Sequence, residues 1–214
     1  MPRPSVVDPG RRLQLPFTGR YPQPHDRRAG MNRKSTAWAV ALAVTASAFA
    51  ATPAVASGGT AAAAPSRAEL AEQVLADDGI TLLDSHVGGQ NDPESTAQRN
   101  IKDTSQGGAA RTSPWSDVGV TKVELSTAML RGMVSIGKDY RYRVTTVAGG
   151  DHSPTSYHYK GTAFDVDQID GQAVNGSNPK VAKIKSACKS AGAVEILGPG
   201  DAGHDTHIHC AWNS

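Results

Sequence analysis

Histidines, which can serve as metal ligands and as general bases, gather in two short stretches of this chain. Seven histidines occur among its 214 residues, and five of them lie in the segments HSPTSYH (152–158) and HDTHIH (204–209). Imidazole binds metal ions through a neutral ring nitrogen and exchanges protons near neutral pH. The two stretches could therefore supply metal ligands, a catalytic base, or both.

The last segment, HIHCAW (207–212), has the side-chain order of a strand with two different faces. Period-two alternation places His207 and His209 on one face, and Ile208 and Cys210 on the other. The imidazole pair would face a common site while Cys210 faces the interior. The chain end is therefore expected to be a core strand rather than a loose tail.

The segment TAFDVD (162–167) alternates in the same way. Asp165 and Asp167 share one face, opposite Phe164 and Val166 on the core side. Two imidazole-bearing segments and one carboxylate strand can supply a His/His/Asp set, and catalytic zinc takes three such ligands and leaves one position for water. Taken singly, an HxH motif is also typical of two solvated histidines, and DxD of a charged strand edge.

The first third of the chain predicts export. Residues 1–30 are rich in Pro, Gly and Arg and are expected to be a non-structural extension, with a start at Met31 as the alternative. Residues 31–56 combine a basic start, an apolar run over 37–51 and a small-x-small end at 54–56, the pattern of a secretory signal peptide. The alternative is an N-terminal membrane anchor, but the run is short and alanine-rich for a span.

Removal of this leader changes the charge of the protein. Residues 1–56 hold eight Lys/Arg and two Asp/Glu, which leaves fourteen basic and eighteen acidic residues, a net charge of about −4 with His neutral, against +2 for the whole chain. The basic surface that nucleic-acid binding requires is missing from the exported part. We expect no nucleic-acid partner, no membrane insertion after cleavage, and a monomer.

Both cysteines of the chain lie in the exported part. Two cysteines in an exported protein predict one disulfide, against the alternative of two buried free thiols. Cys188 lies on the apolar face of an expected helix, so it is a suitable partner for the inward-facing Cys210. Such a bridge would pin the last strand and contribute about 3 kcal/mol to stability in the chain-entropy model.

After a linker at 57–65, residues 66–214 are expected to form one domain. Apolar periodicity and capping signals, including the capping box Ser66/Glu69 and the pairs Asp92-Pro93 and Asn178-Pro179, predict helices over 66–79, 93–106, 122–140 and 178–192. Short strands are expected over 80–86, 142–147, 162–166, 193–197 and 207–212. The pattern favours an α+β fold, with helices packed on a small, mainly antiparallel sheet.

One ten-residue segment resembles a known family. Ser156, His158, Gly161, Ala163 and Asp165 fit the S-x-H-x-x-G-x-A-x-D signature of zinc D-alanyl-D-alanine carboxypeptidases and murein endopeptidases. The terminal H-x-H is similar to a variant found in that family. Residues 142–212 also resemble the signalling domain of hedgehog proteins, which shares the fold.

The resemblance implies a role for each matching residue. His158, Asp165 and His209 would hold one zinc ion, and His207 would be the catalytic base. Ser156 would support the ligands from behind. Gly161 would allow a tight passage from loop to strand, and the small Ala163 would leave room beside the metal.

The chain also departs from the family pattern. Two positions at which relatives place a glutamate are occupied here by Thr206 and Gly203. His204 completes an H-x-x-H-x-H arrangement that is similar to an endopeptidase variant, and it is an auxiliary catalytic candidate. The arginine that holds a substrate carboxylate in carboxypeptidases has no direct counterpart, so Arg143 or Arg141 would have to replace it, and His152 would line the site.

The sequence therefore predicts a secreted zinc-dependent peptidase, associated with the cell wall, that hydrolyses peptidoglycan stem or cross-link peptides next to D-amino acids. One alternative is a hedgehog-like, zinc-stabilised binding domain without turnover. Another is a zinc peptidase of ordinary protein substrates. Elsewhere, His86 and Asp167 are expected at the solvated surface and Trp115 and Trp212 in packing, while Glu195 suits either an outer partner of a zinc-binding histidine or a strand-edge charge.

Overall fold

The computed structural model describes residues 63–214. The expected extension (1–30), the signal peptide (31–56) and most of the linker (57–65) lie outside the described residues. Within 63–214, no helix is both long and apolar enough to cross a membrane.

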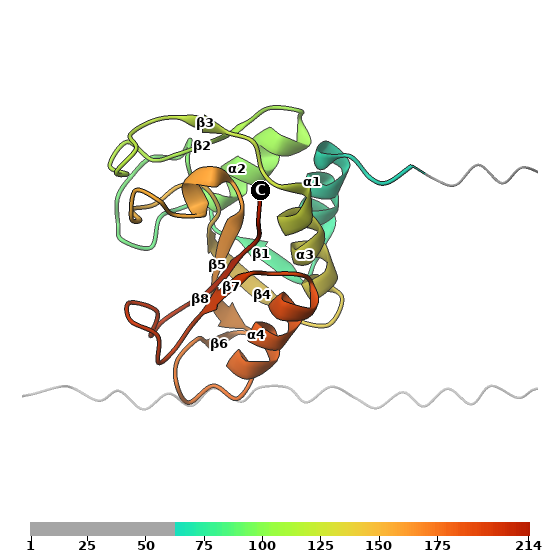
Figure 1. The fold of residues 1–214 in the computed structure, drawn as a ribbon, viewed down its shortest axis with the longest axis vertical. Coiled ribbons are helices and arrows are strands. Elements are labelled where there is room, and N and C mark those ends of the chain that lie inside the picture. Colours follow the sequence, from blue (N-terminus) through green and yellow to red (C-terminus); the bar gives the residue numbers. More distant parts are fainter. Residues whose placement is uncertain (1–62) are drawn as a thin grey trace, which may run out of the picture. The chain divides into compact units, whose positions relative to one another are not determined.

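Four α-helices and a six-stranded sheet form the described part (Figure 1). The helices are α1 (Arg67–Ala76), α2 (Ala97–Ser105), α3 (Thr127–Gly137) and α4 (Val181–Ser190), and a short 3-10 helix, η1, spans His158–Lys160. In the sheet, strands β1 (Ile80–Leu82), β4 (Tyr142–Thr146), β5 (Ala163–Ile169), β8 (Ile208–Ala211) and β7 (Glu195–Leu197) lie in that order, and β6 (Gln172–Ala173) pairs with β5.

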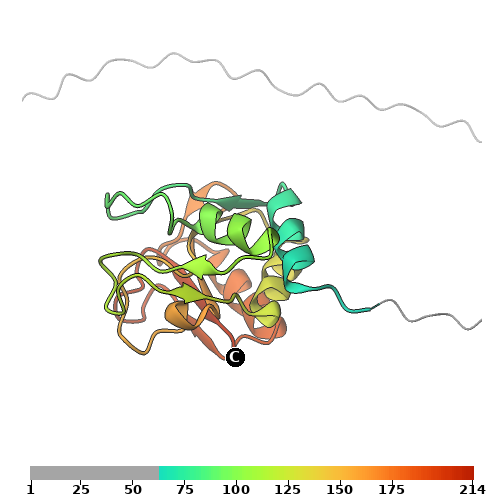
Figure 2. The ribbon, with the colours of Figure 1, turned by 90° about the horizontal axis from the view of Figure 1, so that it is seen from above.

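Only the β1–β4 pair of this sheet is parallel; the other pairs are antiparallel. A second sheet in the described part is the two-stranded β2 (Ala110–Arg111) and β3 (Lys122–Val123). Figure 2 shows this hairpin beside α2 and α1. The expected α+β fold with a mainly antiparallel sheet is confirmed.

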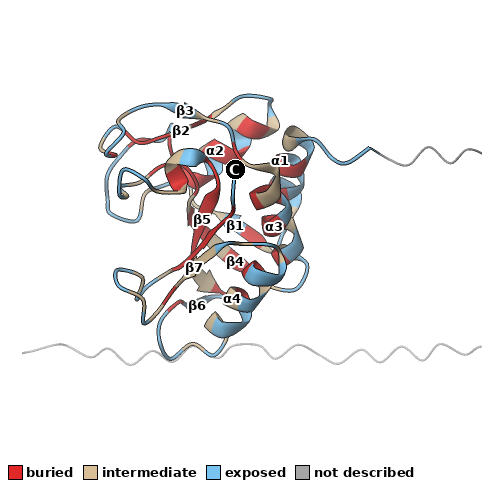
Figure 3. Ribbon diagram, viewed as in Figure 1, coloured by how far each residue is buried: buried red, intermediate tan, exposed pale blue. Residues whose placement is uncertain are grey.

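One face of the sheet carries the hydrophobic core. Phe164 of β5 lies opposite Cys210 of β8 and stacks between Tyr142 and Trp212. The Trp212 ring presses against Gly132 of α3 closely enough that a Cβ atom there would collide with it, and its Nε1 donates to the Ala191 carbonyl at 3.0 Å. Figure 3 shows the resulting burial along β5 and β8. The expected packing role of Trp212 is confirmed.

The predicted disulfide is also confirmed. Cys188 of α4 bonds to Cys210 of β8, and both residues are fully buried. Because Cys210 follows the candidate ligand His209 directly in the chain, the bond ties the last strand to the helix layer. The disulfide is consistent with an extracellular location.

Removal of this bond should weaken the fold measurably. Replacing both Cys188 and Cys210 with alanine is expected to lower the free energy of unfolding by about 3 kcal/mol. The two cysteines are 22 residues apart, and without the bond the unfolded chain regains the conformational entropy of that loop. Urea unfolding of the oxidised protein and the double variant measures this difference. Equal unfolding midpoints would show that packing alone holds the last strand in place.

Three of the four expected helix starts are wrong. The Ser66/Glu69 capping box is present at α1, but α2 begins at Ala97 with Thr96 as its N-cap rather than at Pro93. The Asp92 carboxylate is used elsewhere, accepting hydrogen bonds from Arg111 and Ser95.

The other two helices also begin later in the chain than expected. Lys122 and Val123 form β3 and pair with β2, so α3 cannot start at Lys122. It begins at Thr127 instead. Helix α4 begins at Val181, because Asn178 forms a turn in which its side chain accepts from the amide of Lys180.

Candidate metal centre

Three side chains from three separate elements converge at one end of the sheet. His158 lies in η1, Asp165 in β5 and His209 in β8, and all three are buried. Nε2 of His158 lies 3.1 Å from Oδ1 of Asp165 and 3.1 Å from Nδ1 of His209. The Asp165 Oδ1 to His209 Nδ1 distance, 2.9 Å, closes the triangle.

This triangle fits a metal ion. Ligand atoms that bind one zinc ion tetrahedrally at about 2.0–2.1 Å lie about 3.3 Å from one another, close to the three distances observed. Two imidazole nitrogens and one carboxylate oxygen also form a donor set that zinc accepts. A buried carboxylate facing two imidazoles is a costly arrangement unless a cation or shared protons balance it. The group could therefore bind a metal ion.

The outer nitrogen of each histidine faces an oxygen atom, through a hydrogen bond for His158 and a longer contact for His209. Nδ1 of His158 donates to the Val147 carbonyl at 2.7 Å, which leaves Nε2 free to bind a metal. Nε2 of His209 faces a carboxylate oxygen of Glu195 at 3.4 Å, which leaves Nδ1 free. Such partners fix the tautomer and the orientation of metal-binding histidines. Of the two roles considered for Glu195, its position favours that of outer partner.

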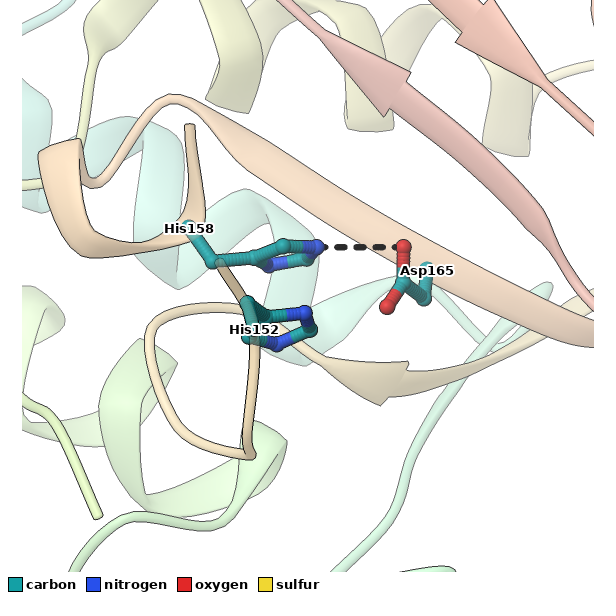
Figure 4. Close-up of side chains that lie close together, drawn as sticks. All are labelled: His152, His158 and Asp165. Atoms are coloured by element: carbon teal, nitrogen blue, oxygen red, sulfur yellow. Dashed lines mark hydrogen bonds and ion pairs between the residues drawn. The ribbon is translucent and has the colours of Figure 1, made fainter. Parts of the chain in front are cut away.

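His152 also lies against this group (Figure 4). Its ring stacks on that of His158, with centroids 4.0 Å apart and planes 12° apart, and one ligand atom each from His152, His158 and Asp165 lie within 4.8 Å of one another. However, Nε2 of His152 donates to the Gly149 carbonyl at 3.0 Å. The triangle that includes His209 is tighter, so we take His152 as a wall of the site rather than a ligand.

Burial and charge set the protonation of the site in the metal-free protein. Burial alone would lower the pKa of His158, but the charge and hydrogen bond of Asp165 outweigh it, and this pKa is raised. Burial alone would raise the pKa of Asp165, but His158 and His209 hold it well below its usual value. Burial lowers the pKa of His152 to about 4, so that its ring is neutral at pH 7.

Metal binding should consequently weaken as the pH falls. A ligand histidine must lose its proton to bind a metal, and the raised pKa of His158 means that protons compete at higher pH than for a free imidazole. We expect the apparent zinc affinity to fall on going from pH 8 to pH 6, with proton release on binding at pH 7. Titration calorimetry in buffers of different ionisation enthalpy measures that release, and binding without proton release would contradict the prediction.

The local backbone explains how His158 reaches the site. Gly161 ends η1 with φ of 67°, a conformation that favours glycine, and a Cβ atom there would lie 2.6 Å from Cγ2 of Val123. The amide of His158 donates to the Ser156 hydroxyl at 3.2 Å. Gly161 thus permits the turn from η1 into β5, and the Ser156 hydroxyl holds the backbone at the start of η1. These are the positions that the sequence motif indicated.

A pocket of about 300 Å³ opens over the three candidate ligands. Its lining includes every histidine of the two stretches from which the sequence argument began. The rings of His207 and His204 are 4.8 Å apart, and that of His204 lies 6.0 Å from His209. The pocket is also lined by Ser153, Thr155, Ser156, Tyr157, Glu195 and Leu197.

His207 has the properties of a proton acceptor in this pocket. Its ring is half-buried, and burial is the main cause that lowers its pKa, which keeps the imidazole neutral at pH 7. The ring of His204 is anchored to the backbone, because its Nδ1 donates to the Ala202 carbonyl at 2.7 Å. The structure thus brings both catalytic candidates to the mouth of the candidate metal site.

The structure does not bring Arg143 to this pocket. Its guanidinium donates to both carboxylate oxygens of Asp167, at 2.8 and 2.6 Å, and it lines a separate pocket with Arg141 and Gln168. The expectation that Arg143 could hold a substrate is therefore not supported. The expectation that Asp167 is simply solvated is wrong, because this ion pair occupies it.

Two further surface residues have partners. His86 is only partly exposed: its Nε2 donates to the Asp92 carbonyl at 3.0 Å, and the edge of its ring meets Trp115 with centroids 4.9 Å apart. The packing role expected for Trp115 agrees with this contact. His86 therefore lies at the surface, as expected, with part of its ring covered by Trp115.

Comparison of the chain with protein-family models, with curated proteins and with solved structures gave no match. The possible metal site therefore rests on the positions of this chain's own side chains. The resemblance to zinc peptidases rests on the sequence motif alone.

Glu195 provides a test of how His209 is held. Glu195→Ala is expected to lower zinc affinity by about tenfold, the lower end for outer partners of metal ligands, because its side chain is 44% exposed. Glu124→Ala is the matched control, since Glu124 pairs with Arg67 at the surface instead. Chelator competition measures both affinities. Equal affinity in wild type and Glu195→Ala would show that the strand alone orients His209.

Proposed function

We propose that the protein is an exported zinc peptidase that cleaves peptide bonds next to D-amino acids in peptidoglycan. The observation that carries this proposal is the placement of His207 beside a closed His/Asp/His triangle in one pocket. The triangle provides three protein ligands, the number that catalytic zinc sites use. The substrate class comes from the resemblance of the 156–165 motif to cell-wall peptidases.

His158, Asp165 and His209 would hold the ion. Zinc bound there would supply Lewis-acid activation of a water molecule and of the peptide carbonyl. His207, neutral and half-buried, would accept a proton from the attacking water and return it to the departing amine. Val147 and Glu195 would keep the ligand rings in place during this exchange.

The pocket favours an internal peptide bond over a terminal one. A substrate's free carboxylate needs a cationic or strong hydrogen-bonding partner when it is bound out of water. Among the described residues, those that line the pocket include the carboxylates of Asp165 and Glu195, whereas the guanidinium of Arg143 lines a separate pocket and is paired with Asp167. We therefore propose endopeptidase action on cross-linked stem peptides rather than removal of a terminal D-alanine.

Digestion of defined muropeptides tests the proposal. The zinc-loaded protein is incubated with cross-linked dimers, with pentapeptide monomers and with ordinary L-peptides, and the products are identified by mass spectrometry. We expect cleavage of the dimers, and slower or no release of terminal D-alanine from the monomers. Cleavage of L-peptides alone would place the protein among general peptidases.

The remaining outcome concerns the alternative without turnover. Full zinc occupancy and binding of muropeptides without hydrolysis of any of them would overturn the proposal. That result would instead support a zinc-stabilised binding domain. The chain's Thr206 and Gly203, at positions where relatives carry a glutamate, make this comparison worth including.

A further inference from the structure

A chain of buried hydrogen bonds lies behind the loop that forms one wall of the pocket. It runs through Asp92, Ser95 and Ser113, none of which lines the pocket. The Ser95 hydroxyl donates to Oδ2 of Asp92 at 2.8 Å, and the hydroxyl oxygens of Ser95 and Ser113 are 2.7 Å apart. Ser113 in turn accepts from the amide of Gly150 at 2.9 Å.

These hydrogen bonds all run in one direction. Because Ser95 gives its single hydroxyl hydrogen to Asp92, the hydrogen between the two serines must come from Ser113. Ser113 then faces Gly150 as an acceptor. The chain ends on the Asp92 carboxylate, which Arg111 holds through Nη1 at 2.9 Å from each oxygen. Buried hydrogen bonds linked in this way to a charged end polarise one another and gain strength.

The loop is held closely against this chain. A Cβ atom on Gly149 would collide with the Ser95 carbonyl oxygen, so the backbone of the loop lies directly against Ser95. Gly150 adopts φ of 87°, a conformation that favours glycine, and its amide donates to Ser113. Loss of the Ser113 hydroxyl would leave that amide without its partner, which favours movement of the loop away from Ser113.

The same loop touches the candidate metal ligands on its other side. The Gly149 carbonyl accepts from Nε2 of His152, and the His152 ring stacks on that of His158. Just before the loop, the Val147 carbonyl accepts from Nδ1 of His158. The loop thus determines where the His158 ring lies, both through a hydrogen bond and through a stacked neighbour.

We propose that Ser113, oriented by Ser95 and Asp92, is a positioning residue of the metal site. It fixes the loop 147–152, and the loop fixes the rings of His152 and His158. The inference deepens the proposed function, since it rests on His158 acting as a metal ligand. Its consequence is that a hydroxyl outside the pocket, on the loop between β2 and β3, sets the affinity of the site for metal.

The test compares Ser113→Ala with wild type, using the full chain with labelled histidine. In the metal-free wild type, NMR should show His152 with its proton on Nε2 and slow exchange of that proton, because it is donated to Gly149. Ser113→Ala is expected to speed this exchange and shift the ring signals of His152 and His158. Zinc affinity should fall by about tenfold, as for outer groups that orient ligands.

Ser116→Ala is the matched control. Ser116 is a buried serine of the same loop, and its hydroxyl donates to the carbonyls of Ser113 and Gly119 rather than joining the chain. It should lower stability while leaving the His152 proton and zinc affinity close to wild type. A Ser113→Ala protein that keeps the slow proton and wild-type affinity would overturn the inference. So would equal changes in both serine variants.

A second variant covers the case in which Ser113→Ala does not fold. Asp92→Asn removes the charge at the far end of the chain while keeping its shape, and it should loosen the same His152 proton. An unchanged signal in Asp92→Asn would likewise overturn the inference. The NMR readout needs neither metal nor turnover. If the wild type cleaved no muropeptide but the variants showed these NMR changes, the proposed function would be overturned and the positioning role would stand.

Discussion

Asp165→Asn is expected to abolish specific zinc binding while leaving the protein folded. Asp165 contributes the only carboxylate of the candidate triangle, within 3.1 Å of both imidazole nitrogens. The neutral amide keeps the shape of the side chain but removes the charge that attracts the ion. Loss of a direct ligand should exceed the roughly 10–100-fold reduction in affinity that outer partners cause when they are removed.

Asp167→Asn gives a close control for this variant. Asp167 lies two residues along the same strand, is partly exposed and pairs with Arg143 outside the pocket. It should bind zinc as the wild type does. Metal content after dialysis and the rise in melting temperature on adding zinc both report the difference, since a ligand that binds only the folded state stabilises it. Wild-type affinity in Asp165→Asn would mean that any metal binds elsewhere.

His207→Ala should separate metal binding from turnover. His207 lines the pocket but is not part of the ligand triangle, so the variant is expected to keep its zinc. Removal of a positioned general base typically costs about 10²–10⁴-fold in rate, and we expect a decrease of that order in kcat on a cross-linked muropeptide. KM should change little, because the loss concerns proton transfer rather than binding.

His204→Ala, measured in parallel, identifies which imidazole moves the proton. The His204 ring lies 4.8 Å from that of His207 but is anchored to the Ala202 carbonyl at the rim. We expect a smaller loss of kcat than in His207→Ala. A fully active His207→Ala together with an inactive His204→Ala would transfer the role of base to His204. Activity in both would assign it to solvent.

The elements that position the site could be predicted where the signal is local. The capping box at Ser66 and the alternation of His207 and His209 with Ile208 and Cys210 depend only on neighbouring residues, and both are present in the structure. The disulfide could also be predicted, because the chain has only two cysteines. The motif from Ser156 to Asp165 predicted a glycine turn at 161 between His158 and Asp165, and the structure has that turn.

The parts that could not be predicted depend on partners distant in sequence. Asp92 has the local signature of a helix cap, yet Arg111, 19 residues away, takes its carboxylate. Arg143 was free to be a substrate ligand until β4 and β5 paired and placed it against Asp167. The hairpin of β2 and β3 has two residues in each strand, too few for any alternation to be visible.

Glu195 illustrates the same limit within the site. Its place in a short strand suited either a solvated edge charge or a partner of a ligand, and only the pairing of β7 with β8 decides between them. In that register Leu197 lies opposite His209, and the Glu195 carboxylate reaches the outer nitrogen of the His209 ring. Long-range strand pairing is set by the whole sheet rather than by local residue order.

The buried bond between Cys188 and Cys210 would link the candidate metal site to the redox state of its surroundings. In a reducing cytosol the strand that carries His209 would lack its tether, and the third ligand would be held less firmly. Oxidation after export would lock that strand before or while the ion is acquired. An exported peptidase of the kind proposed above would then reach its full metal affinity only outside a reducing compartment.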